Sequence, residues 1–86
     1  MFKKRRGIKL PYKRQGLIYF TCLDIANQRP EGVEKINRLC DKIGGEYRDE
    51  LYQVMTTEQS VRSIAMQHHV SETTLYNLRK QFYESW

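Results

Sequence analysis

Apolar residues recur at helical spacing along most of this chain, and polar positions divide them into short segments. Residues 29–45 show the pattern most clearly, because Pro30 suits a first helical turn and Gly44-Gly45 can end a helix. Between these limits runs a stripe with three- and four-residue spacing, made of Val33, Ile36, Leu39, Cys40 and Ile43. The next segment, residues 46–57, carries a similar stripe made of Tyr47, Leu51, Val54 and Met55. Both segments are predicted to be helices.

The run at residues 17–26 is apolar on nearly all sides, so its periodicity does not distinguish a buried helix from a strand. Pro11 is acceptable in a first helical turn, and no other part of the sequence offers a strand that would pair with this run. We therefore predict a helix over residues 11–28.

Near the C-terminus the apolar pattern stops at two histidines and resumes in a different phase. A helix predicted at residues 58–68 has on one side Val61, Ile64, Ala65 and His68. The following helix begins at Ser71, whose hydroxyl can accept hydrogen bonds from the free amides of the first turn. Its inward stripe is Leu75, Leu78, Phe82 and Trp86. Two helices joined by a turn of three or four residues form a helix-turn-helix unit. A small side chain is needed where the two backbones approach, and Ala65 meets that need.

These segments predict an all-α fold, a small helical bundle of about five helices. We expect a flexible basic arm at residues 1–11 and a helical domain at residues 12–86, with the helix-turn-helix at about residues 58–83.

The segment "VRSIAMQHHVSETTLYNLRKQF" resembles the helix-turn-helix of bacterial transcription regulators, of site-specific invertases and resolvases, and of the promoter-reading region of sigma factors. The similarity rests on an "IA" first helix, a turn that ends in "VS" and a "TLY" second helix. It departs at His69, where these families usually carry glycine at a position of positive φ. The rest of the chain is similar to small phage or mobile-element regulators of Gram-positive bacteria. The resemblance implies sequence-specific DNA binding and transcription regulation in a phage or mobile element.

The distribution of charge adds a second indication. The formal net charge is +5, and residues 1–14 hold seven of the fifteen basic side chains and no acidic one. Residues 15–86 hold eight basic and ten acidic side chains, a net of −2. The positive excess therefore belongs to the N-terminal arm. Such an arm suits a polyanion, nucleic acid before an anionic membrane, although a solvated tail that aids solubility is the simpler alternative.

If the helix that begins at Ser71 enters a DNA major groove, its outward polar side chains face the bases. Asn77 suits adenine, Thr73 a thymine methyl group and Glu72 the amino group of cytosine. The full set of candidate base contacts is Glu72, Thr73, Tyr76, Asn77 and Lys80. Candidate contacts to the DNA backbone are Gln59, Arg62, Ser71, Thr74, Arg79, Lys3, Lys4, Arg5 and Arg6. For each of them, a solvated helix face or tail is the alternative.

Nothing in the sequence points to an enzyme, a metal site or a cofactor. His68 and His69 are adjacent, so on a helix they diverge by about 100 degrees and cannot share one metal ion. No paired carboxylates occupy an apolar setting that would tune a pKa. Cys22 and Cys40 lie in apolar stretches and are predicted to be buried thiols rather than a disulfide.

The expected partner is double-stranded DNA, and the expected location is the cytoplasm. No apolar run approaches the roughly 18 residues that a membrane span needs, and no secretory signal is recognisable. Two other functions compete: a module that binds RNA polymerase, and a small accessory subunit in DNA packaging or recombination. The chain has more aromatic residues than a small core requires, so part of them can form a homodimer or partner surface. These aromatic residues are Tyr12, Tyr19, Phe20, Tyr47, Tyr52, Tyr83 and Trp86.

Overall fold

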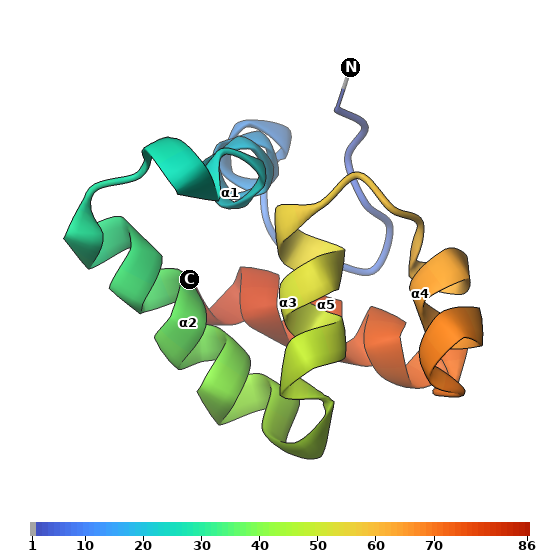
Figure 1. Cartoon of the computed structure of the whole chain (residues 1–86). Helices are drawn as coiled ribbons and strands as arrows, with labels where there is room; N and C mark the ends of the chain where they lie inside the picture. The colour runs from blue at the N-terminus through green and yellow to red at the C-terminus, as the bar shows by residue number, and fades with distance from the viewer. Residues whose placement is uncertain (1) are drawn as a thin grey trace.

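The computed structural model describes residues 2–86, and its regular elements are helical throughout that range (Figure 1). No strand occurs among these residues, which confirms the predicted all-α class. Helix α3 is central, because it contacts each of the other α-helices. The 3-10 turns Ile25–Asn27 and Gly45–Tyr47 precede α2 and α3. The α-helices are α1 (Tyr12–Leu23), α2 (Pro30–Gly44), α3 (Arg48–Thr56), α4 (Val61–His68) and α5 (Glu72–Ser85).

Helix α1 is shorter than the predicted 11–28, because it ends at Leu23 and the chain turns at Asp24. Its apolar run is also not buried on all sides. The stripe that faces the core consists of Gln15, Ile18 and Cys22. Leu17 and Phe20 are 57% and 54% exposed. The run reads as uniformly apolar because one apolar stripe faces the core and a second one faces outward.

Helix α4 begins at Val61, three residues later than the predicted start. The reason is a cap: the Ser60 hydroxyl accepts a hydrogen bond from the Ser63 amide at 3.0 Å, and this satisfies one of the free amides of the first turn. Residues 58–60 therefore belong to the loop that connects α3 to α4.

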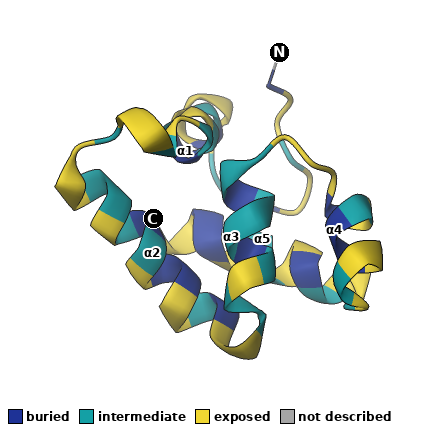
Figure 2. Cartoon of the chain, viewed as in Figure 1, coloured by how far each residue is buried: buried dark blue, intermediate teal, exposed yellow. Residues whose placement is uncertain are grey.

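The core has two parts (Figure 2). The larger part lies between α1, α2, α3 and α5, and the smaller part joins α4 to α5. Val54 and Leu78 pack against both parts and connect them. Fully buried side chains of the larger part include Ile18, Ile36, Leu51 and Phe82. The smaller part consists of Val61, Ile64, Ala65 and Leu75.

Cys22 and Cys40 are buried and unpaired in the described chain, as predicted. Burial in the apolar core is the main cause that raises the pKa of the Cys22 thiol to about 12 and that of Cys40 to about 11. Both side chains therefore stay protonated at neutral pH and act as small apolar groups.

Helices α4 and α5 are joined by the three residues His69, Val70 and Ser71. His69 adopts a left-handed conformation with φ of 56°, and within residues 2–86 no other non-glycine residue has a positive φ. Val70 packs under the turn against the smaller part of the core. The Ser71 hydroxyl accepts from the Thr74 amide at 3.4 Å, which confirms the predicted cap of α5.

His68 is tied to α3 by two side-chain contacts. Its Nδ1 lies 3.3 Å from Glu50 Oε2, and its Nε2 lies 3.3 Å from Gln53 Nε2. These contacts fix the end of α4 against α3, so the orientation of the following turn is set by the body of the protein.

The N-terminal arm, residues 2–10, is irregular but lies against the helices, although we expected a flexible arm. Phe2 and Ile8 are each only 6% exposed and anchor the two ends of the basic run. Gln15 is fully buried and holds the backbone between them: its Oε1 accepts from the Arg5 amide at 2.8 Å. Its Nε2 donates to the carbonyls of Ile8 at 3.3 Å and Leu10 at 3.0 Å. The first residue of the predicted arm lies outside the described residues.

Candidate functional site

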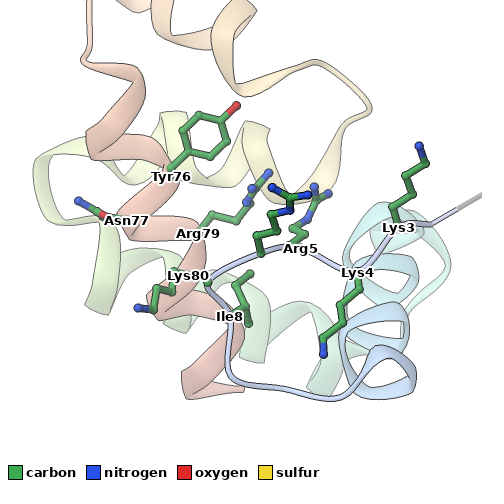
Figure 3. A pocket seen from close by; sticks show the side chains of 10 residues that line it. Lys3, Lys4, Arg5, Ile8, Tyr76, Asn77, Arg79 and Lys80 are labelled. Atoms are coloured by element: carbon green, nitrogen blue, oxygen red, sulfur yellow. The ribbon is translucent and has the colours of Figure 1, made fainter.

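A cleft of about 540 Å³ lies between the N-terminal arm and α5 (Figure 3). Six lysine and arginine side chains line it, and no acidic residue does so within the described chain. Opposite ends of the sequence therefore form one strongly basic surface, called the basic cleft below. Its lining residues are Lys3, Lys4, Arg5, Arg6, Gly7, Ile8, Tyr76, Asn77, Arg79 and Lys80.

Arg5 is held in the wall of the basic cleft by several contacts. Besides the bond from its amide to Gln15, its Nε donates to the Tyr83 hydroxyl at 3.4 Å. Its guanidinium carbon lies 5.6 Å and 5.5 Å from the ring centroids of Phe2 and Tyr19. The positive charge is attracted to the electron-rich faces of these rings, and this cation–π interaction stabilises the position of Arg5. Arg5 thus has a defined position before any ligand binds.

Arg79 projects into the basic cleft from α5 and lies close to Arg5. Figure 3 shows the two side chains extending toward the same region. The Arg79 guanidinium carbon is 4.8 Å from the Tyr76 ring centroid. Its Nε is buried and finds no hydrogen-bond acceptor among residues 2–86.

The electrostatics of Arg79 favour an anion. Burial is the main cause that lowers the pKa of its guanidinium, and the positive charge of Arg5 lowers that pKa further. Both effects are costs of holding desolvated cations side by side, and the attraction of a negative group bound between them offsets both costs. The arrangement can therefore bind a phosphate or another anion.

The structure brings together three of the candidate base contacts and separates two. Tyr76, Asn77 and Lys80 line the basic cleft, Tyr76 and Asn77 being exposed and Lys80 half-buried. Glu72 is exposed and lies by a shallower hollow next to the α4–α5 turn. Thr73 is exposed on the same helix and lines neither the basic cleft nor that hollow.

The candidate contacts to the DNA backbone are likewise found partly at the basic cleft and partly away from it. Besides the arm residues and Arg79, Gln59 lies near Arg5, Tyr76 and Arg79 at a third hollow, in front of the start of α4. Arg62 is exposed at the hollow beside the α4–α5 turn. Ser71 is exposed, but its hydroxyl already accepts from the amide of Thr74.

Sequence reasoning missed the residues that hold the arm in place. Phe2, Gln15 and Tyr83 contact Arg5 or its neighbours, and none of them was a candidate DNA contact. Two signals were present in the sequence. Phe2 and Ile8 are apolar residues on either side of a basic run, and Gln15 falls at the spacing of the stripe that contains Ile18 and Cys22.

Two other features would bear on function in the part of the chain that the structure describes, a cluster of metal ligands and a membrane-spanning helix. No three His, Cys, Asp or Glu side chains there are grouped so that they could hold a metal ion. None of the described helices is both long and apolar enough to cross a membrane.

Comparison with known proteins adds no relative: no family model, no curated protein and no solved structure matches the chain.

Proposed function

We propose that this protein binds double-stranded DNA in a sequence-specific manner, through a helix-turn-helix formed by α4, the turn at residues 69–71 and α5. One observation carries the proposal: the basic run of the N-terminal arm and the polar face of α5 line the same cleft, with no carboxylate among the lining residues. Affinity for DNA depends on cations placed at the phosphates, and specificity depends on a helix that reaches the base edges. The basic cleft combines both.

The local geometry of α4 and α5 supports this assignment. Ala65 is only 6% exposed and lies in the small core between the two helices, where a larger side chain would push them apart. The left-handed residue His69 turns the chain sharply, and the Ser71 cap starts α5 directly afterwards. A short turn between two packed helices is the arrangement that presents the second helix to a major groove.

In the proposed complex the N-terminal half of α5 enters the major groove. Asn77 pairs with adenine through its amide, Thr73 contacts a thymine methyl group, and Glu72 accepts from cytosine. Tyr76 and Lys80 contact bases at the edge of the groove beside the arm. A good bidentate pair contributes about 1–3 kcal/mol of discrimination against the wrong base.

The phosphate contacts come from the arm and from Arg79, with Gln59, Arg62, Ser71 and Thr74 on the neighbouring strand. Because Phe2, Ile8 and Gln15 already hold the arm, its cations bind phosphate without the entropy loss of ordering a free tail. The biological role that we propose is transcription regulation in a phage or mobile element, as the resemblance of residues 58–83 implies.

The test of specificity is selection from a random duplex library, followed by affinity measurements on the selected sequence. Asn77→Ala should relax the preference at one base pair and leave binding to unrelated DNA unchanged. Asn27→Ala is the matched control, because Asn27 is exposed and does not line the basic cleft. A library with no enriched sequence would contradict the proposal.

The test of the arm removes positive charges from it and leaves Phe2 and Ile8, which anchor it, unchanged. The triple variant Lys3→Gln/Lys4→Gln/Arg6→Gln removes three cations of the arm. Each lost phosphate contact should lower the slope of log affinity against log salt by about 0.9, a total of about 2.7. A control with the same charge change removes three exposed cations of the α2 region, namely Arg29, Arg38 and Lys42. If both triple variants change the slope equally, the arm has no specific role.

A further inference from the structure

A second surface of the protein, apart from the basic cleft, carries exposed residues at regular helical spacing. On the outer side of α1, Lys13, Leu17 and Phe20 are followed by the C-cap residue Asp24, at steps of four, three and four residues. Leu17 and Phe20 are 57% and 54% exposed, and the two charged residues are exposed as well. These four residues, called the α1 stripe below, lie opposite the buried stripe of the same helix. Their spacing is that of a seam between two packed helices.

The α1 stripe is complementary to itself when a second copy runs antiparallel to it. Its midpoint falls between Ile18 and Tyr19, and positions equally far from that midpoint are Leu17 with Phe20 and Lys13 with Asp24. A twofold axis at the midpoint therefore places each apolar side chain on an apolar one. It also places the basic end of each helix on the acidic end of the other. A parallel pair would instead set like charges against each other.

We propose that the α1 stripe is the contact surface of an antiparallel homodimer of this chain. Such a contact is isologous, so the same four residues serve on both copies. Phe2 supports it from the side, because its ring centroid lies 5.0 Å from that of Tyr19 and 6.4 Å from that of Phe20. The exposed aromatic side chain at the centre of the stripe is Phe20, and aromatic residues are enriched at interface centres.

The dimer leaves the proposed DNA site free. No residue of the α1 stripe lines the basic cleft of the described chain, so each copy keeps its own cleft and its own α5. The proposal does not depend on DNA binding, because it rests on the exposure, spacing and charge of the α1 stripe and on the packing of Phe2 beside it. One pair of short helices is a small interface, and we expect a dimer that dissociates at low protein concentration.

The experiment is sedimentation equilibrium of the full chain without DNA, at concentrations up to about 1 mM. The chain should show a monomer–dimer equilibrium. Leu17→Glu places a charge in the apolar centre of the contact and should raise the dissociation constant of the dimer at least tenfold. Met66→Glu is the control, because Met66 is 69% exposed on α4 and should leave the dissociation constant unchanged. Circular dichroism checks that both variants keep their helices.

A charge exchange tests the antiparallel register. Lys13→Glu alone and Asp24→Lys alone each place like charges together and should weaken the dimer roughly two- to tenfold. The double variant Lys13→Glu/Asp24→Lys restores opposite charges across the twofold axis, so the affinity should return. Asp24 also accepts a hydrogen bond from Asn27 Nδ2 at 2.7 Å, so a melting curve of each variant checks that the loss of this bond leaves the fold intact.

Three results would overturn the proposal: a monomer at every concentration, a dimer that survives Leu17→Glu, or a double variant that fails to recover. The first result would mean that the α1 stripe is free or binds a different protein. None of the three bears on the DNA proposal, which is tested by duplex selection and salt dependence.

Discussion

Replacing Gln15 with leucine tests whether the N-terminal arm is held in place, as the basic cleft requires. Gln15 is fully buried and makes three hydrogen bonds to the arm, at 2.8, 3.3 and 3.0 Å. Each bond contributes about 1 kcal/mol net, so their joint loss should cost about 3 kcal/mol. For a domain of this size, 1 kcal/mol shifts the melting temperature by about 4–8 °C, and Gln15→Leu should lower it by roughly 12–24 °C. This is an upper value, because a detached arm returns its backbone groups to water.

Two measurements on the purified chain test this prediction, one of overall stability and one of the position of the arm. Thermal unfolding followed by circular dichroism gives the change in melting temperature. Limited trypsin digestion then reports on the arm itself, because its run of lysine and arginine is a substrate only when the backbone leaves the surface of the protein. Gln67→Leu is the control: Gln67 is exposed on α4, and its substitution should stay within about 0.5 kcal/mol of the wild type.

The reasoning fails if Gln15→Leu melts with the wild type and its arm is cleaved no faster. The arm would then not be held by this side chain, and the basic cleft would lack its second wall. A large drop in melting temperature without faster cleavage of the arm would also count against it, since the lost stability would then come from elsewhere in the core.

Other predictions follow from single positions. His69→Gly should raise the stability by about 0.5–1 kcal/mol, because glycine adopts the observed positive φ without strain, and a melting curve measures it. Ala65→Leu should cost about 1–3 kcal/mol by overpacking the α4–α5 contact, and should weaken binding to the selected duplex. Cys22 and Cys40 should resist alkylation at pH 8 until denaturant is added. Their raised pKa values of about 12 and about 11, against 9.0 for an ordinary thiol, also predict a pH dependence. The unfolded thiols lose protons first, so the free energy of unfolding should fall as the pH rises from about 9 toward 12, which denaturant titrations at several pH values would show.

Much of the fold could be predicted because it depends on short-range spacing and sterics. The stripe of α2 and its glycine end, the cap at Ser71 and the burial of both cysteines follow from residues within a few turns of each other. The turn at His69 was also predictable, since the compact connection requires a left-handed residue there. The limits of α1 and α4 were less accurate, because the same apolar run suits a longer helix and Ser60 competes as a cap.

The sequence by itself therefore determined the helical class, the positions of the turns and the concentration of positive charge at the N-terminus. Only the tertiary structure decided which apolar stripe of α1 faces the core, and that the arm packs along α1 and α5 to form the basic cleft. The physical reason is that burial is a long-range property. Gln15 is a polar interruption in an apolar helix until the carbonyls of Ile8 and Leu10 and the amide of Arg5 converge on it. Arg5 and Arg79 likewise become neighbours only when the two ends of the chain pack together.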